Sequence, residues 1–177
     1  MKFVATELQG LMLVQPERLA DERGDFARTY CARAFAEHGL EPRFVQCSVS
    51  RNPRAGTLRG LHFQVAPHEE AKLVRTAAGS IFDVAVDLRP ESASYLRWFG
   101  VELSAANGWA LYIPAGFAHG FQTLAPDTEV FYMMSADYVA EAARGVRWDD
   151  PTLAIAWPPA AHRIISGKDR ALPGVAT

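Results

Sequence analysis

Short runs of alternating apolar and polar residues, separated by Gly, Pro, Asn and Asp, make up most of this chain. In residues 80–88, SIFDVAVDL, the side chains of Val84 and Val86 fall on one face of an extended strand, and those of Asp83 and Ala85 on the other. Similar runs occupy residues 10–16, 25–31, 43–50, 57–64, 71–77, 97–103, 109–114, 120–124 and 129–139, and residues 17–24 are expected to form a polar turn. This spacing of short strands predicts a β-sandwich or a closed barrel.

The remaining segments predict little regular structure. Residues 32–40, ARAFAEHGL, fit one helix with Gly39 as its C-terminal cap. Residues 148–174 are Pro-rich and irregular, and we expect them to wrap around the barrel. We therefore expect residues 1–177 to form one domain.

Composition narrows the functional classes. The net charge is −2 and no basic run occurs, which disfavours nucleic-acid binding. The chain contains no run of 18 apolar residues, so no membrane span is predicted. The N-terminal MKFVATELQG lacks a signal-peptide core, so we expect a cytoplasmic protein without membrane contact. Cys31 and Cys47 form no CxxC pair, so free thiols are expected.

Arg59 and His62 stand in the otherwise apolar run TLRGLHFQ. Their spacing of three would direct them to opposite faces of a regular strand, unless a bulge at Gly60 brings them together. Further ionisable groups lie in apolar runs, where they are costly unless paired or used, and a closed barrel would gather them into one pocket. They are Lys72, Asp83, His119, Tyr132 and Tyr138.

The segment PAGFAHG, residues 114–120, resembles the second motif of the cupin jelly roll, which returns a histidine into the barrel. The first cupin motif usually supplies two further histidines and a glutamate as metal ligands. Here the matching positions hold His62 and Gln64, so the ligand set is incomplete and we expect no metal and no other cofactor.

Together, RGLHFQ, AKLVR, FDVAVDLR, GVELSAAN, IPAGFAHGF, RGVRWDDP and SGKDRALP resemble the dTDP-4-dehydrorhamnose 3,5-epimerase family. The resemblance implies an all-β cupin-type double-stranded β-helix, or jelly roll, with a few short helices. It also implies an isomerase of dTDP-L-rhamnose synthesis, which serves cell-surface polysaccharides. Such an enzyme removes and returns protons at C3 and C5 of a nucleotide-linked 4-keto-6-deoxyhexose without a cofactor.

The resemblance assigns the catalytic roles. His62 is the base, Asp169 orients its imidazole, Tyr132 is the acid on the opposite face, and Lys72 stabilises the enolate oxygen. Asp83 is implied as a pocket group that supports the residues in contact with the substrate.

The resemblance also implies a set of substrate contacts. Arg59 and Arg23 bind the diphosphate and Phe26 stacks on the base. The remaining contacts are Gln46, Ser48, His119 and Tyr138. Family members are homodimers in which the N-terminal strand of one subunit pairs into the sheet of the other, and we expect the same here because MKFVATEL would otherwise leave a sheet edge open.

Arg28, Ser48 with Val49, and Met133 depart from the family pattern near the substrate. These departures leave open an epimerase of C3 or C5 alone, or of another nucleotide sugar such as a CDP-linked one. A non-catalytic cupin that binds a sugar nucleotide and a metal-dependent cupin oxygenase are the remaining alternatives.

Overall fold

The computed structural model describes residues 1–175, which form two antiparallel β-sheets, an isolated hairpin and two short helices. The first sheet has the order β1-β2-β10-β7-β12-β5 and the second the order β13-β6-β11-β8-β9. The elements are β1 Lys2–Ala5, β2 Met12–Gln15, β3 Arg18–Asp21, β4 Gly24–Ala27, α1 Ala32–Glu37, β5 Gln46–Asn52, β6 Leu58–Gln64, β7 Lys72–Ala78, β8 Ser80–Asp87, β9 Trp98–Ser104, β10 Ala110–Ile113, β11 Phe117–Thr123, β12 Thr128–Met134, β13 Ala143–Gly145 and α2 Gly167–Arg170.

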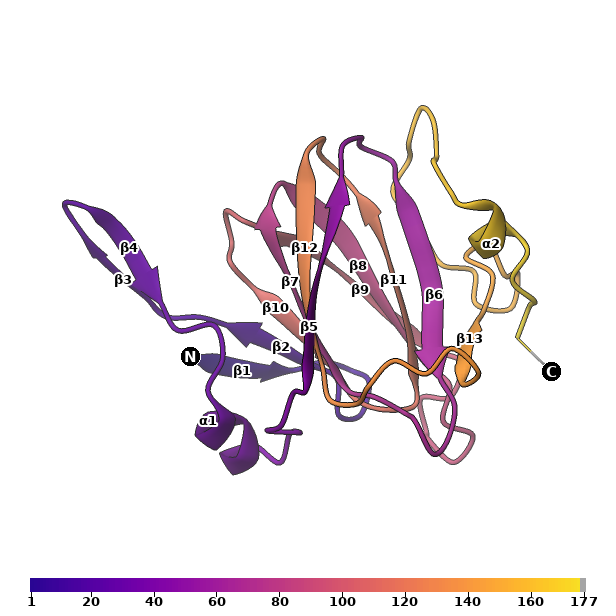
Figure 1. Ribbon diagram of the computed structural model, residues 1–177, viewed down its shortest axis with the longest axis horizontal. Helices are drawn as coiled ribbons and strands as arrows, with labels where there is room; N and C mark the ends of the chain where they lie inside the picture. The colour runs from indigo at the N-terminus through magenta and orange to yellow at the C-terminus, as the bar shows by residue number, and fades with distance from the viewer. Residues whose placement is uncertain (176–177) are drawn as a thin grey trace.

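The two sheets lie face to face, as Figure 1 shows, and enclose the main apolar core. The first sheet contributes Leu13, Val74 and Leu111, and the second contributes Ile81 and Phe121. Alternation along each strand directs these residues inward, and burying each large apolar side chain contributes about 1.5–3 kcal/mol. This core holds the two sheets at a fixed separation.

The outer faces of both sheets are also covered. On the first sheet, Phe35 of α1 packs with Val14 and Tyr112. On the second, Val84 and Val86 of β8 pack beneath the C-terminal part of the chain, which supplies the side chains of Val146, Leu153, Ile155 and Trp157. The apolar face of SIFDVAVDL is therefore the outer one, and Asp83 lies on the inner face with Ala85.

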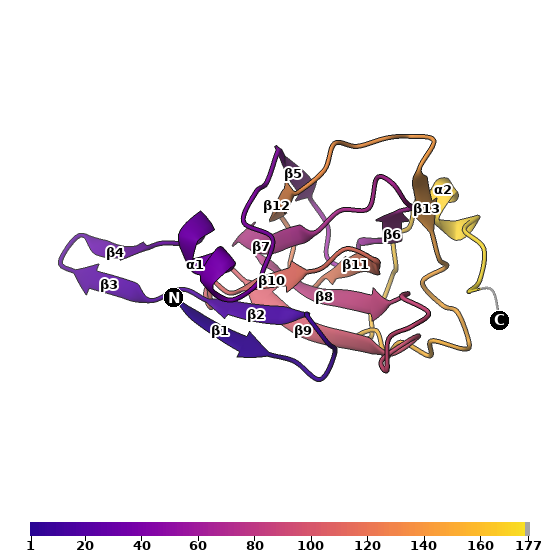
Figure 2. The same cartoon turned by 90° about the horizontal axis from the view of Figure 1, so that it is seen from below.

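The hairpin β3–β4 projects away from the sheets, as Figures 1 and 2 show from two directions. Arg18 anchors its base, with Nη2 hydrogen bonds to the carbonyl oxygens of Ala105 and Ala106. Leu19 and Phe26 are 65% and 69% exposed, so the hairpin presents apolar side chains to its surroundings.

The predicted all-β jelly roll with a few short helices is confirmed. The polar turn predicted at residues 17–24 is wrong, because residues 18–21 form β3 and the turn is confined to Glu22 and Arg23. The predicted helix ends at Glu37, although Gly39 does adopt a positive φ of 69° just beyond it. In residues 1–175, no helix is long and apolar enough to cross a membrane.

Candidate active site

A cavity of about 470 Å³ opens between the two sheets, where β5 and β12 face β6 and β11. Side chains from both sheets line it, together with residues of α2 and of the loop that follows β12. The ionisable and polar lining residues are Gln46, Ser50, Arg59, His62, Glu70, Lys72, His119, Tyr132, Tyr138, Ser166, Lys168 and Asp169.

A bulge at Gly60, which the sequence left open as an alternative to a regular strand, brings Arg59 and His62 to the same cavity. His62 pairs with His119 across the strands and Arg59 pairs with Phe121, so only Gly120 stands opposite Gly60 and Leu61. Gly60 has a φ of 124°, and an added Cβ would lie 2.6 Å from the Cα of Gly120. Only glycine fits this backbone, and the extra residue rotates His62 onto the face that carries Arg59.

His62 and Asp169 form a hydrogen-bonded pair, with 2.8 Å between Nε2 and Oδ1. Asp169 is held from two sides, because its N–H donates to Oγ of Ser166, the N-cap of α2, and its Oδ2 accepts from the N–H of Gly60 at 3.2 Å. The His62 side chain is 46% exposed, whereas that of Asp169 is 7% exposed. A carboxylate accepts hydrogen bonds only, so Nε2 is the nitrogen that donates to Asp169. Nδ1 has no hydrogen-bond partner among residues 1–175, and its lone pair is the one available as a base.

A second pair, His119 and Asp83, lies on the neighbouring strands β11 and β8, with 2.7 Å between Nε2 and Oδ1. Burial raises the pKa of Asp83, and His119 opposes that shift. Oδ2 of Asp83 is buried and has no hydrogen-bond partner among residues 1–175. The pair forms the inner wall of the cavity, with His119 in front.

Tyr132 enters the cavity from β12, in the opposite sheet, with its ring centroid 6.0 Å from that of His119. Burial raises the pKa of Tyr132 strongly, and the charge of Asp83 raises it further. The charge of Arg59 and a hydrogen bond with Ser50 lower the pKa of Tyr132, but by less than burial raises it. The phenol therefore keeps its proton over the whole physiological range.

Lys72 and Arg59 add positive charge to the cavity, which Lys168 also lines. Lys72, at the start of β7, forms an ion pair with Glu70, and burial lowers its pKa while Glu70 raises it. Arg59 lies nearer β5, and its Nε donates to Oδ1 of Asn52 at 2.9 Å. That bond fixes the guanidinium, and among residues 1–175 its two terminal nitrogens have no hydrogen-bond partner, so they are available to an anionic ligand.

The structure brings most of the predicted site residues together. His62, Asp169, Tyr132 and Lys72 line the cavity, as do Gln46, Arg59, His119 and Tyr138, and Asp83 lies behind His119. Ser48 does not line it, although it pairs with Tyr132 across the strands; its side chain is exposed on β5.

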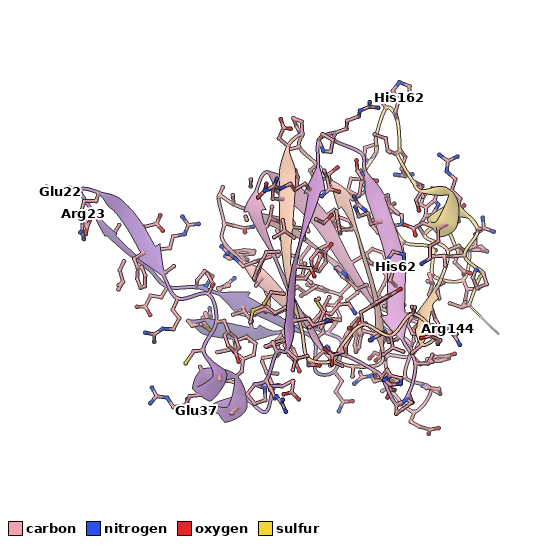
Figure 3. The ribbon with its side chains drawn as sticks, viewed as in Figure 1. Glu22, Arg23, Glu37, His62, Arg144 and His162 are labelled. Atoms are coloured by element: carbon pink, nitrogen blue, oxygen red, sulfur yellow. The ribbon has the colours of Figure 1, made fainter. Side chains whose placement is uncertain are left out.

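Arg23 and Phe26 do not reach this cavity within the same chain. Figure 3 shows Arg23 at the far end of the hairpin, well away from His62. Its guanidinium pairs with Asp21, 2 residues before it, and Phe26 is exposed on β4. Within one chain, Arg23 and Phe26 therefore lie away from the cavity, because β3–β4 extends outward instead of folding over the barrel.

Sequence reasoning missed Ser50, Glu70, Lys168 and Asn52. Lys168 stands beside Asp169 in SGKDR, and Glu70 lies 2 residues before Lys72, so their neighbours in the chain were the available signal. Asn52 and Ser50 carry no such signal, because only strand pairing places them here. Within residues 1–175, no group of three or more His, Cys, Asp or Glu residues is arranged to hold a metal ion.

Comparisons with known proteins agree with the geometry. The family model described as dTDP-4-dehydrorhamnose 3,5-epimerase matches residues 5–177. A dTDP-4-dehydrorhamnose 3,5-epimerase of Methanothermobacter thermautotrophicus is 47% identical over 171 residues, which cover 96% of this chain and 91% of that protein. The crystal structure of a dTDP-4-dehydrorhamnose 3,5-epimerase from Bacillus anthracis, with TDP and PPi bound, superposes with a TM-score of 0.95 at 42% identity and covers 98% of this chain and 99% of that one. A 3′-monoepimerase from Streptomyces bikiniensis, in complex with dTDP-quinovose, has a TM-score of 0.89 at 29% identity and covers 96% of this chain and 85% of that one.

Proposed function

Because this chain belongs to the dTDP-4-dehydrorhamnose 3,5-epimerase family, we propose that it converts dTDP-4-dehydro-6-deoxy-D-glucose to dTDP-4-dehydro-L-rhamnose. The observation that carries this proposal is the opposition of the His62–Asp169 pair on one sheet to Tyr132 on the other, across one cavity. Inverting a carbon requires a base on one face and an acid on the opposite face. A protein that only binds a sugar nucleotide has no need of both.

The first step is removal of a proton from a carbon next to the C4 ketone. Nδ1 of His62 takes the proton, and the C–H electron pair forms a carbon–carbon double bond while the carbonyl oxygen becomes an enolate. Asp169 supports this step because its carboxylate stabilises the imidazolium that forms. The hydrogen bond of Asp169 to Gly60 keeps the carboxylate aimed at His62.

The enolate needs a positive partner. Lys72 is the proposed one, since its ammonium lines the same cavity and is shielded from water. An ammonium in a shielded site stabilises a developing negative charge far more than it would in bulk water.

The second step returns a proton from the other side of the sugar ring. Tyr132 donates its phenolic proton to the carbon, and the C4 carbonyl re-forms as the enolate collapses. The raised pKa of Tyr132 ensures that the phenol is protonated when the enolate appears. Solvent then reprotonates the tyrosinate and accepts the proton of His62, and a second round inverts the other carbon.

The diphosphate is the proposed ligand of Arg59, whose terminal nitrogens have no hydrogen-bond partner in the described part of the chain. We include Arg23 and Phe26 as substrate contacts, supplied by a partner subunit. Two features support a homodimer: the hairpin exposes Leu19 and Phe26, and within residues 1–175 one edge of β1 has no neighbouring strand, because β1 pairs only with β2.

A cytoplasmic location is also part of the proposal. Cys31 and Cys47 are both free thiols, which is usual for proteins in a reducing compartment.

Proton NMR with dTDP-4-keto-6-deoxyglucose in deuterated water tests the function. We expect solvent deuterium at both C3 and C5, and we expect His62→Ala to abolish it while substrate binding persists. Label at only one carbon would show a monoepimerase. No label from folded protein would reject this substrate, and a CDP-linked sugar would be offered next.

Mixing two impaired variants tests the dimer. His62→Asn lacks the base, and the double variant Arg23→Ala/Phe26→Ala lacks the hairpin contacts. After subunit exchange, half of the dimers hold one intact site, so roughly a quarter of the wild-type activity should return. If the mixture stays as inactive as its components although mixed dimers are detected, the hairpin does not serve the partner's cavity.

A further inference from the structure

The ion pair between Lys72 and Glu70 lies in the wall of the cavity with little access to water. The two side chains are only 11% and 9% exposed. Burial lowers the pKa of Lys72, and the Glu70 carboxylate raises it. Without that carboxylate, the lysine would lose its proton at a lower pH and would also lack a partner that fixes its position.

Glu70 is itself held in place by a buried amide. Its Oε1 contacts Nζ of Lys72, and its Oε2 accepts from Nε2 of Gln64 at 3.3 Å. Gln64 is 4% exposed, and the same Nε2 donates to the carbonyl oxygens of His68 and Asp137 at 2.9 and 3.1 Å. Its Oε1 accepts from the N–H of Val139 at 2.6 Å. Gln64 therefore fixes the loop before Glu70 against the loop after β12, and both carboxylate oxygens of Glu70 are occupied.

The pair also separates the cavity from a second, more apolar one of about 390 Å³, which is lined in part by Phe63, Leu172 and Pro173. Glu70 and Lys72 border both cavities. The other ionisable groups that line one or both cavities are Arg59 and His62 on β6, His119 on β11, Tyr132 on β12, Arg144 on β13, Lys168 and Asp169 on α2, and Tyr138 in the loop after β12. Among residues 1–175, Glu70 is the one carboxylate that borders the second cavity, so it offsets several cations at once.

We propose that Glu70 is a positioning residue of the epimerase, which holds the Lys72 ammonium where the enolate oxygen develops. This inference rests on the proposed function, since it assumes that Lys72 stabilises the enolate. Glu70 needs no contact with the substrate, because it acts through Nζ of Lys72 and through Gln64 behind it.

The test compares Glu70→Gln with Glu69→Gln in the epimerisation of dTDP-4-keto-6-deoxyglucose, across the pH range. Glu69 is the adjacent residue and is exposed, so it is a matched control of the same chemistry. We expect Glu70→Gln to lower kcat about tenfold near pH 8, to move the alkaline limb of the kcat profile to lower pH by about one unit, and to leave KM nearly unchanged. Glu69→Gln should match the wild type.

A second pair of variants separates positioning from folding. In a Lys72→Met background, Glu70→Gln should cause no further loss of kcat, because its effect passes through the lysine. Glu70→Asp keeps the charge and should restore part of the rate, and it replaces Glu70→Gln if that variant does not fold.

The outcomes divide cleanly. A Glu70→Gln profile equal to that of Glu69→Gln, or an equal loss in the Lys72→Met background, would overturn the role of Glu70 while leaving the epimerase intact. A wild-type protein that incorporates no deuterium at C3 or C5 would instead overturn the proposed function, and this inference with it.

Discussion

The molecule contains two histidine–aspartate pairs of nearly the same geometry, and they differ mainly in their access to water. His62–Asp169 and His119–Asp83 have Nε2–Oδ1 distances of 2.8 and 2.7 Å, and the two histidines are register partners on β6 and β11. The His62 side chain is 46% exposed and that of His119 is 5% exposed. A short distance between a histidine and a carboxylate therefore does not by itself make that histidine a base.

The carboxylates differ as much as the imidazoles. Oδ2 of Asp169 accepts a backbone hydrogen bond from Gly60, whereas Oδ2 of Asp83 is buried without a partner among residues 1–175. The charge of Asp83 raises the pKa of Tyr132 instead. We infer that the first pair moves protons and that the second sets the environment of the acid.

The largest difference between the two pairs is expected in kcat when each histidine is replaced in turn. His62→Asn should lower kcat by about 10³–10⁴-fold, because it removes the base. His119→Asn should lower kcat much less and act mainly on KM and on the free energy of unfolding. Deuterium incorporation and thermal unfolding of both variants measure the two effects. Equal losses of kcat in two folded variants would contradict the division between the pairs.

Replacing each aspartate in turn should change kcat in the same order, with a smaller difference between the two variants. Asp169→Asn keeps the shape but cannot stabilise an imidazolium, so kcat should fall by about 10²–10³-fold. Asp83→Asn should lower kcat less, since Asp83 is hydrogen-bonded to His119 and acts on the acid Tyr132 only through its charge. Steady-state kinetics at a fixed pH are sufficient, and an Asp83→Asn variant slower than Asp169→Asn would reverse our assignment.

The sequence and the family resemblance together predicted His62 and Asp169, but not the residues that hold Asp169 in place. RGLHFQ points to His62 and the bulge at Gly60, because both are local features of one strand. Asp169 lies 107 residues away, and only the family resemblance assigned it, since a charge between Lys168 and Arg170 otherwise reads as a surface group. The residues that fix it, Ser166 and Gly60, are far apart in the sequence, and the pairing of Ile164 with Thr57 helps to bring them together.

The hairpin and the support of Lys72 were harder to predict. All four residues of β3 are exposed, so no apolar alternation distinguishes this strand from a turn. Glu70 lies in a polar loop, and nothing local indicates that the amide of Gln64 draws the loop inward. Both failures concern segments whose structure depends on distant contacts or on a partner.

The bulge that serves Asp169 has no counterpart at Asp83, and Gly60→Ala tests what it contributes. The added methyl would meet the backbone of Gly120 and would require a φ of 124° from a non-glycine residue. We expect a loss of about 2–3 kcal/mol in the free energy of unfolding, together with a lower kcat. Gly167→Ala is the control, because its added Cβ meets nothing within 4 Å. Equal stability of the two variants, measured by urea unfolding, would show that the bulge is not constrained.

The smallest expected effect concerns how stability depends on pH. Asp83 and Asp87, both on β8, should contribute to the free energy of unfolding with opposite dependence on pH. Burial raises the pKa of Asp83 above 3.8, so the folded state holds the proton more tightly and the contribution of Asp83 to stability is greatest in acid. That contribution is lost as the pH rises through the raised pKa. Asp87 behaves oppositely: burial acts to raise its pKa, but hydrogen bonds from Arg89, Ser92 and Ser94 lower it overall.

The stabilisation from Asp87 is therefore present above pH 3.8 and is lost as the pH falls through the lowered pKa. Urea unfolding of the wild type, Asp83→Asn and Asp87→Asn from pH 3 to 8 separates the two cases. The advantage of the wild type over Asp83→Asn should shrink as the pH rises, and its advantage over Asp87→Asn should grow. Slopes of the same sign would mean that the pairing with His119 outweighs burial, so that folding does not raise the pKa of Asp83. Exposure to water would then be the main difference between the two histidine–aspartate pairs.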